Sequence, residues 1–288
     1  MKQFNNKVIA ITGAGSGIGR ALAVQLAKHG TLLALNDWDE TALLETLALI
    51  GQTPDKILFK VFDVRERDSW DAFLAAILHH FGRVDGLINN AGATVFSGAA
   101  VSISSESYER ILDINLWSVI HGSQAFVPKL LESPDALLVN MSSLLGLIGY
   151  AGQAPYVVSK FAIRGFTETL RQELMGTSVK VVQVHPGPIR TNLLRNAPHE
   201  NQDLIDYWAN AYDKASPTSA EEAAARILKD IQKGKLRIVF GHNTPLLDII
   251  SRLLPQRYHR FIPHQFRNGQ MRQLAEEQAG KTKQGQSV

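Results

Sequence analysis

The sequence of 288 residues contains no cysteine. This absence excludes a disulfide scaffold, zinc sites built from thiolates and a cysteine nucleophile. No apolar run approaches the roughly 18 residues that are needed to cross a bilayer. The apolar stretch after the basic N-terminus extends only from Val8 to Thr12 before glycines follow, which is too short for a secretory signal. We therefore expect a cytoplasmic protein.

Metal-ligand spacing is also lacking. The nine histidines include His79, His80, His259 and His264, and none shows a convincing ligand spacing with carboxylates. We therefore expect no metal site. His185, which precedes a Pro-Gly-Pro turn, is interpreted as structural.

Charge is scarce and unevenly placed. Charged residues make up 20% of the chain and hydrophobic residues 45%, which is typical of a globular protein and excludes disorder. The net charge is +3, but the segment from Ser251 to the end carries +5 and the rest of the chain −2. A nucleic-acid binder is more often basic across a folded face, so we expect no nucleic-acid partner.

Short apolar runs alternate with longer amphipathic runs over the first 240 residues. The predicted strands are 7–12, 32–35, 57–62, 84–89, 136–140, 179–184 and 236–240. The predicted helices are 18–29, 40–50, 69–81, 107–131, 156–174 and 220–233. This alternation predicts βαβ units and an α/β, doubly wound fold. The uniformly apolar strands indicate a seven-stranded, mostly parallel sheet with helices on both faces.

Two segments interrupt the alternation. Residues 189–219 are polar and rich in proline and asparagine, and they interrupt the pattern within a single domain that covers residues 1–241. Residues 242–288 form a basic, amphipathic, helical C-terminal extension whose polar end is expected to fray.

A glycine-rich turn follows the first predicted strand and opens the first helix, in TGAGSGIG from Thr12 to Gly19. Glycines permit a tight turn and let the backbone approach a pyrophosphate, whose charge the N–H groups of the helix start can bind. The bare pattern is weak, but its place within a βαβ unit predicts a dinucleotide-binding Rossmann turn.

Asp37 ends the second strand, 18 residues after Gly19. A carboxylate there can accept hydrogen bonds from the adenosine ribose, and its charge would repel the additional phosphate of NADP. The next residue is Trp38 rather than a cation, and Ser16 in the turn is uncharged. The pattern favours NAD over NADP, although Asn36 could share the adenosine contact.

Tyr156 and Lys160 are four residues apart in YVVSK, so a helix places them on one face. An ammonium beside a phenol favours the phenolate and lowers the pKa of the tyrosine. Ser143 follows the fifth strand, at the carboxyl edge where doubly wound folds bind ligands. Asn115 lies in the long predicted helix before that strand.

Together these motifs resemble the short-chain dehydrogenase/reductase family, of the typical single-domain type. The resemblance covers residues 6–241 and rests on TGAGSGIG, Asp63-Val64, NNAG (89–92), Asn115, Ser143, YVVSK and HPGPIRT (185–191) in the family's order and spacing. Each motif alone is weak, but jointly they are specific. Lys160 and the glycine turn argue against the epimerase-like and cofactor-free dehalogenase relatives.

The resemblance implies four catalytic residues. Tyr156 would be the general acid/base, Lys160 would lower its pKa and hold the nicotinamide ribose, Ser143 would hydrogen-bond the substrate oxygen, and Asn115 would hold a water of the proton relay. The implied cofactor-binding residues are Gly13, Ser16, Gly17, Ile18, Gly19, Asp37, Trp38, Asp63, Val64, Asn90, Gly92, Tyr156, Lys160, Pro186, Gly187, Ile189 and Thr191.

The substrate loop after Ser143, residues 144–153, is apolar and carries no charge to pair with a carboxylate or phosphate. We expect Leu145 to contact substrate together with Ser143 and Tyr156, and residues 94–96 to form another wall. The resemblance implies that the polar segment at about 189–219 is a lid over the substrate, and its central part, 192–214, carries Tyr207, Trp208 and Tyr212. These features favour a hydrophobic alcohol or ketone, although the loop's apolar residues could equally pack in the core or at a subunit contact.

The C-terminal extension allows two interpretations. Its leucines and isoleucine at 246, 247, 250, 253 and 254, with neighbouring arginines, could contact a membrane surface. We favour a helical extension that packs on its own or a neighbouring subunit.

The sequence thus predicts an NAD(H)-dependent oxidoreductase that interconverts a secondary alcohol and a ketone, with a small-molecule substrate. The alternatives are a non-catalytic dinucleotide-sensing or regulatory protein and an NADPH-dependent carbonyl reductase. The resemblance implies a homodimer or homotetramer.

Overall fold

A parallel sheet of seven strands forms the centre of the computed structural model, which describes residues 1–51, 53–95, 99–195, 210, 213 and 216–262. In the order β3-β2-β1-β4-β5-β6-β9, the strands all run parallel. Their bounds are β1 Val8–Thr12, β2 Leu32–Asp37, β3 Ile57–Val61, β4 Gly86–Asn89, β5 Ala136–Met141, β6 Val179–Pro186 and β9 Arg237–Phe240. The predicted seven-stranded doubly wound fold is confirmed.

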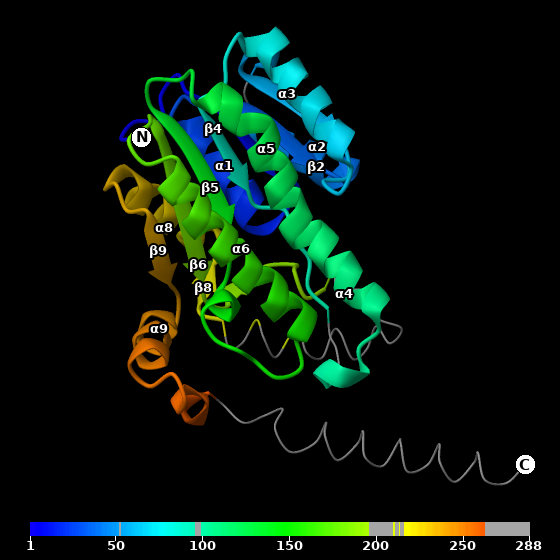
Figure 1. The fold of residues 1–288 in the computed structure, drawn as a ribbon. Helices are drawn as coiled ribbons and strands as arrows, with labels where there is room; N and C mark the ends of the chain where they lie inside the picture. Colours follow the sequence, from blue (N-terminus) through cyan, green and yellow to red (C-terminus); the bar gives the residue numbers. More distant parts are fainter. Residues whose placement is uncertain (52, 96–98, 196–209, 211–212, 214–215, 263–288) are drawn as a thin grey trace, which may run out of the picture.

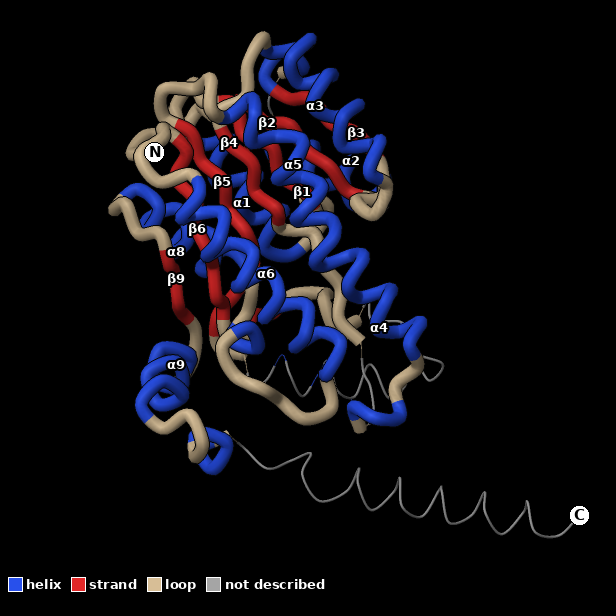
Figure 2. Tube along the Cα trace, in the orientation of Figure 1, coloured by secondary structure: helices blue, strands red, loops and turns tan. Residues whose placement is uncertain are grey.

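Helices cover both faces of the sheet, as Figures 1 and 2 show. Their bounds are α1 Gly17–Lys28, α2 Glu40–Ile50, α3 Arg67–Phe81, α6 Ala154–Glu173 and α8 Ala220–Gln232. Ile9 and Ile11 pack in one core cluster with α1 and α8, whereas Val8 and Ala10 pack in the other with α3. Because successive side chains point to opposite faces, a strand covered on both sides must be apolar throughout.

The long helix predicted for residues 107–131 is three segments instead. It consists of α4 Ser105–Leu112, a π-helical turn Asp113–Trp117 and α5 Ser118–Leu130. A π turn adds one residue to the hydrogen-bonded ring and leaves the helix continuous, so the apolar period does not reveal it. Asn115 lies inside this turn.

Two additions follow β6. β7 Ile189–Arg190 pairs with β8 Thr218–Ser219 in a second, two-stranded sheet that the sequence did not predict, and it joins the two ends of the predicted lid. The lid's Tyr207, Trp208 and Tyr212 lie outside the described residues. After β9, α9 Thr244–Leu253 and a 3₁₀ turn Tyr258–Phe261 extend beyond the sheet edge (Figure 1).

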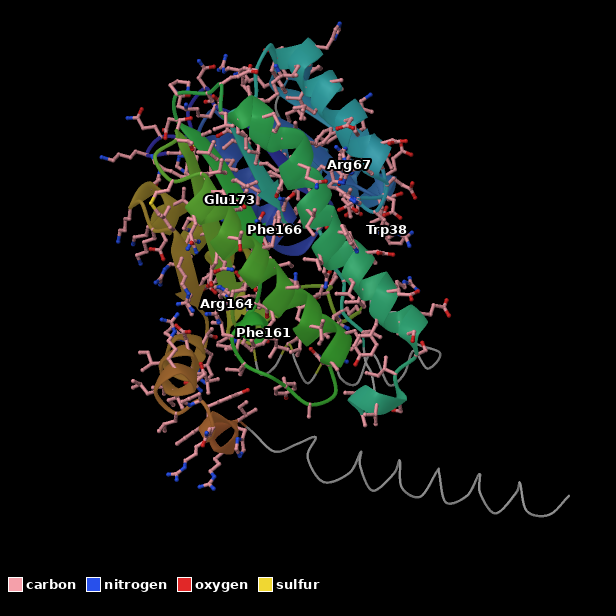
Figure 3. The ribbon with its side chains drawn as sticks, in the orientation of Figure 1. Trp38, Arg67, Phe161, Arg164, Phe166 and Glu173 are labelled. Carbon is pink, nitrogen blue, oxygen red and sulfur yellow. The ribbon has the colours of Figure 1, made fainter. Side chains whose placement is uncertain are left out.

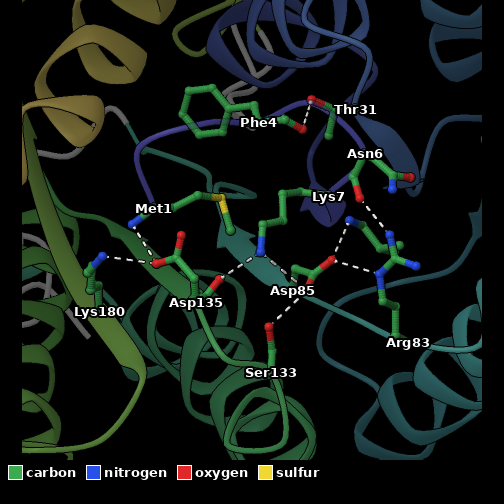
Figure 4. A network of polar contacts seen from close by, with 11 residues as sticks. Met1, Phe4, Asn6, Lys7, Thr31, Arg83, Asp85, Ser133, Asp135 and Lys180 are labelled. Carbon is green, nitrogen blue, oxygen red and sulfur yellow. Dashed lines mark hydrogen bonds and ion pairs between the residues drawn. The ribbon is translucent and has the colours of Figure 1, made fainter.

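The amino-terminal edge of the sheet holds a network of paired charges (Figure 4). Asp85, at the start of β4, accepts hydrogen bonds from Val8 N at 2.9 Å, Ser133 Oγ at 2.8 Å and Arg83 Nε at 3.2 Å. Asp135, at the start of β5, pairs with Lys180 at 2.9 Å. These contacts tie the starts of β1, β4, β5 and β6 together, which leaves the carboxyl edge for the site.

Candidate active site

The glycine turn between β1 and α1 has the close approaches that its sequence predicts. Gly13 and Gly17 have φ angles of 65° and 53°, in the left-handed region that favours glycine. A Cβ on Gly13 would lie 2.8 Å from Ala91 Cα, and one on Gly19 would lie 2.5 Å from Asn90 Nδ2. Ser16, the residue that caps α1, makes no side-chain hydrogen bond to the helix. The bare backbone at a helix start fits a bound pyrophosphate.

Asp37 lies at the end of β2 beside this turn. Its Oδ2 accepts a hydrogen bond from Gly15 N at 2.7 Å, and its Oδ1 accepts one from Asp39 N at 3.1 Å. Trp38 is 77% exposed and projects outward (Figure 3). The suggestion that Asn36 shares the adenosine contact is wrong, because Asn36 is fully buried and its amide donates to the backbone of β3 and the residue after it.

Arg20 is a residue that the sequence analysis missed. From the first turn of α1 its guanidinium donates hydrogen bonds to the carbonyl oxygens of Gly15 and Ala42, and it pairs with Glu45 at 2.8 Å. The side chain therefore braces the glycine turn against α2, and its charge is already paired. The sequence signal that could have indicated this contact is an arginine in the first turn of α1 and an acidic residue in α2.

Asn90 and Gly92 connect the glycine turn to the other side of the site. Asn90 Nδ2 donates to the carbonyl oxygens of Thr12 and Gly13, at 2.9 and 3.1 Å. A Cβ on Gly92 would lie 3.1 Å from Asn115 Oδ1 and 3.4 Å from Lys160 Nζ. Glycine at this position therefore leaves room for two of the predicted catalytic side chains.

Asn115 is fully buried in the π turn, and its amide is held on both sides. Its Oδ1 accepts from Ala93 N at 2.8 Å, while its Nδ2 donates to Ala93 O and to Ser159 Oγ, both at 2.9 Å. Ser159 Oγ in turn donates to Tyr156 O at 2.8 Å. Asn115 thus fixes the loop after β4 against the helix that carries Tyr156.

Tyr156 and Lys160 lie on one face of α6, as their spacing predicts. Lys160 Nζ is 5.4 Å from the centroid of the Tyr156 ring and donates to Met141 O at 3.1 Å. Lys160 is 5% exposed, and burial lowers its pKa to about 8. Burial disfavours the charged form, so at neutral pH this ammonium stays protonated with little margin and can support a phenolate nearby.

Ser143 begins the 3₁₀ turn Leu144–Gly146, and its Oγ accepts a hydrogen bond from Leu145 N at 3.2 Å. His185 Nδ1 lies 2.9 Å from Ser143 O. Burial lowers the pKa of His185 to about 4, so the imidazole is neutral at physiological pH and must carry its proton on Nδ1 to donate. His185 therefore holds the backbone of Ser143 in place.

A cavity of about 820 Å³ brings most of the predicted site together. The predicted residues that line it are Gly13, Ser16, Gly17, Ile18, Asp37, Asn90, Gly92, Ser143, Leu145, Tyr156, Lys160, Pro186, Gly187, Ile189 and Thr191. Gly19, Trp38, Asp63, Val64 and Asn115 do not line it. The C-terminal residues Leu246, Leu247 and Ile250 also line the cavity, although the sequence suggested for them a membrane contact or packing on a subunit. Phe261 and Ile262, which the sequence did not single out, line it as well.

Asp63 is engaged by its neighbour, Arg65. Arg65 Nε donates to Asp63 Oδ2 at 2.9 Å, and Arg65 N donates to Asp63 Oδ1 at 3.0 Å. These hydrogen bonds hold the pKa of the Asp63 carboxyl below its ordinary value. Val64 is buried, and its carbonyl oxygen accepts from Trp70 Nε1 at 2.9 Å.

Within 1–51, 53–95, 99–195 and 216–262, no group of three or more His, Asp or Glu side chains could hold a metal ion. In the same part of the chain, no helix combines the length and apolarity needed to traverse a bilayer.

The chain matches known proteins over most of its length. SadH of Mycobacterium tuberculosis, which is assigned as an oxidoreductase, is 39% identical over 265 residues, covering 91% of this chain and 96% of SadH. A cyclopentanol dehydrogenase of Comamonas testosteroni is 32% identical over 224 residues, covering 78% of this chain and 86% of that enzyme.

Solved structures agree with this relationship. A short-chain dehydrogenase/reductase from Burkholderia phymatum, solved in complex with NAD, superposes with a TM-score of 0.79 at 28% identity, covering 91% of this chain and 96% of that one. The family model described as short chain dehydrogenase matches residues 7–202. With the glycine turn and the Tyr156–Lys160 pair in one cavity, the chain therefore belongs to the short-chain dehydrogenase/reductase family, oxidoreductases that act on CH–OH donors with NAD(P).

Proposed function

We propose that this protein is an NAD(H)-dependent oxidoreductase that interconverts a secondary alcohol and a ketone with an apolar remainder. The observation that carries the proposal is a single cavity lined by the glycine turn at one end and by Ser143, Tyr156 and Lys160. A dinucleotide held at the turn and a substrate oxygen near Tyr156 would share this cavity.

In the proposed mechanism the Tyr156 hydroxyl exchanges a proton with the substrate oxygen as general acid/base. The Lys160 ammonium, close to the Tyr156 ring, stabilises the phenolate form. The Ser143 hydroxyl donates a hydrogen bond to the substrate oxygen where charge develops. When bound, the nicotinamide supplies the redox step by accepting or donating hydride. Asn115 keeps α6 in register with the loop after β4. Because the side-chain amide of Asn115 is already hydrogen-bonded, the relay water expected there would need a backbone group as a further partner.

The cofactor would be held by the backbone of residues 13–19, by Asn90 and Gly92, and by the segment from Pro186 to Thr191. Asp37 supports NAD, because its carboxylate is fixed at the mouth of the turn and would repel a ribose phosphate. The guanidinium of Arg20 is shared between Glu45 and the carbonyl oxygens of Gly15 and Ala42, which makes it a weaker partner for such a phosphate. Asp63, Val64 and Trp38 do not line the cavity, so this proposal gives them no direct contact with the cofactor.

The substrate class follows from the opposite wall. Leu144, Leu145 and Ile148 of the substrate loop line the cavity, and none can pair with a charged substrate. The relative from Comamonas testosteroni is named for cyclopentanol, an apolar cyclic alcohol. We infer a substrate of this general kind.

We also propose that the protein is a homo-oligomer. The π turn before α5 exposes Trp117 by 48%, and α6 exposes Val158 and Phe161 by 45 and 38%. Arg164 lies beside Phe161 (Figure 3). Apolar side chains gathered on helices that lie outside the cavity are suited to contact a second copy. Light scattering after gel filtration gives the oligomeric state.

The test of the proposed function is Tyr156→Phe, assayed with NAD and cyclopentanol. Loss of the phenolic proton should reduce kcat by about 10³-fold, within the range of general acid–base catalysis, while NADH affinity stays within about twofold. Tyr108→Phe is the matched control, since Tyr108 Oη donates to Ala100 O on the surface. Equal turnover by Tyr156→Phe would contradict the role given to Tyr156, and no turnover by the wild type would favour a dinucleotide-sensing protein. Turnover only with NADPH and cyclopentanone would favour a carbonyl reductase.

A further inference from the structure

The C-terminal segment 242–262 forms a wall of the reaction cavity. Five of its apolar side chains line the cavity: Leu246, Leu247, Ile250, Phe261 and Ile262. The segment lies after the last strand of the sheet and beyond residues 7–202, the part that matches the family model. The cavity of this chain is therefore bounded on one side by residues outside the matched core.

The first part of this segment is anchored on the sheet. Asp248 of α9 is 8% exposed and accepts two hydrogen bonds from Arg237 of β9, at 2.8 and 2.7 Å. Arg252, one turn later, donates to the same carboxylate at 3.1 Å. This bidentate pair fixes the rotation of α9 about its axis, so that Leu247 and Ile250 line the cavity.

The second part is attached to the substrate loop. Gly149 N donates a hydrogen bond to Tyr258 Oη at 3.1 Å, across 109 residues of sequence. The neighbours of Gly149 in the loop, Ile148 and Tyr150, also line the cavity. A Cβ on Gly149 would lie 3.3 Å from Tyr258 Oη, so glycine allows the phenol to reach the backbone.

The two anchors bring two apolar walls together. One wall is the substrate loop, with Leu144, Leu145 and Ile148, and the other is the C-terminal segment. The polar groups of the site, Ser143 and Tyr156, lie in the same cavity. A substrate whose oxygen meets these groups would place its apolar remainder between the two walls, where removal from water stabilises it in proportion to its area.

We propose that Tyr258 is a positioning residue that closes the C-terminal wall on the substrate loop, and that the closed wall selects alcohols and ketones with an extended apolar group. This inference rests on the proposed function for the chemistry, but the binding of an apolar ligand between the walls is independent of it. Tyr258 touches neither the reacting atoms nor the cofactor turn.

The test is Tyr258→Phe, which keeps the ring and removes the acceptor oxygen. Binding of 2-decanone to the full chain without cofactor is measured by calorimetry, and kcat and KM are measured with NAD for 2-butanol and 2-decanol. We expect about tenfold weaker 2-decanone binding and a similar rise in KM for 2-decanol. The kcat for both alcohols and the KM for 2-butanol should stay within about twofold. Tyr108→Phe, which removes a surface tyrosine hydrogen bond, should leave all values unchanged.

The outcomes separate the two proposals. If the wild type oxidises neither alcohol but Tyr258→Phe weakens 2-decanone binding about tenfold, the proposed function is wrong, whereas the role of Tyr258 in closing the C-terminal wall is supported. If the wild type does not bind 2-decanone, or Tyr258→Phe binds it equally well, the proposed role of Tyr258 is wrong. An equal loss for both alcohols would also overturn it, since it would show a general structural role.

Discussion

Buried charged groups lie at both the amino-terminal and the carboxyl-terminal edge of the parallel sheet, but their surroundings differ. At the amino-terminal edge, Asp85 accepts three hydrogen bonds and lies 3.8 Å from Lys7 Nζ (Figure 4). At the carboxyl edge, Lys160 is held by the carbonyl oxygen of Met141, and burial lowers its pKa to about 8. A compensated charge holds strands together, whereas a charge buried against a neutral carbonyl remains able to act on a neighbour.

The two edges also differ in what holds their backbone. The amino edge is bound by side chains that reach between strand starts, such as Lys180 to Asp135. The carboxyl edge is shaped by glycines, which leave N–H groups and space where side chains would otherwise stand. Substitutions at the two edges should therefore separate stability from function.

Gly19→Ala should have the largest effect, because the added Cβ would collide with Gly13 O and lie 2.5 Å from Asn90 Nδ2. We expect NADH affinity to fall by at least about 100-fold, since the turn must open to relieve the collision. Fluorescence titration with NADH measures this. Unchanged affinity would show that the turn is not the cofactor site.

Lys160→Met should lower activity and raise stability at neutral pH. Between pH 8 and the ordinary lysine pKa of 10.5, the unfolded chain holds a proton that the folded chain has lost, so the free energy of unfolding rises with pH across this window. Below this window, the buried ammonium destabilises the wild type by about 3 kcal/mol. Lys160→Met removes this cost but leaves the Met141 carbonyl oxygen without its donor, which destabilises the variant by about 1 kcal/mol. We expect a net gain of about 2 kcal/mol at pH 7.

Urea unfolding of wild type and Lys160→Met at pH 7 and pH 10 measures the difference. The advantage of the variant should shrink towards zero at pH 10. An advantage that is the same at both pH values would contradict the assignment of the buried charge to Lys160.

Asp85→Asn should destabilise the fold and spare the site. Asparagine can accept with one atom only, so either Val8 N or the Ser133 and Lys7 side of the network loses its partner. We expect a loss of about 2 kcal/mol in the free energy of unfolding, with kcat per folded molecule unchanged. Asp71→Asn, which breaks the exposed pair with Arg67, is the control and should cost less than about 0.5 kcal/mol. Loss of activity in folded Asp85→Asn would remove the contrast between the edges.

Gly165→Ala should have the smallest effect and the opposite sign. Gly165 is exposed within α6, and a Cβ there meets nothing within 4 Å. Alanine is the better helix former, so we expect a gain of about 0.5–1 kcal/mol. A thermal melt measures it, and the variant also serves as the matched glycine control for Gly19→Ala. The gain assumes that the contact proposed at Val158 and Phe161 leaves Gly165 open. Destabilisation here would mean that a second copy also covers Gly165, one turn after Phe161.

The sequence predicts the sheet and most of its helices because each strand is buried on both faces. Continuous apolar runs such as Val8–Thr12 then stand out between amphipathic segments. The π turn at Asp113–Trp117 was not predictable, since it keeps the helix continuous. The short β7–β8 pair has two residues in each strand, too few for any pattern.

The candidate site divides along similar lines. Tyr156, Lys160 and the glycine turn depend on local spacing, and the structure places them as predicted. Tyr258 with Gly149, and His185 with Ser143, are pairs far apart in sequence that only the fold brings together. Whether the side chain of Asn36 is buried or faces the cofactor depends on how β2 is aligned with β3. The spacing of Asn36 from the glycine turn does not define this alignment.

The most direct test of the whole account is a titration of the purified protein with NADH and, separately, with NADPH, followed by nicotinamide fluorescence. The account predicts at least about tenfold tighter binding of NADH, and loss of that preference in Asp37→Ala. Tighter binding of NADPH would contradict the role given to Asp37, and binding of neither would contradict the dinucleotide site at the carboxyl edge.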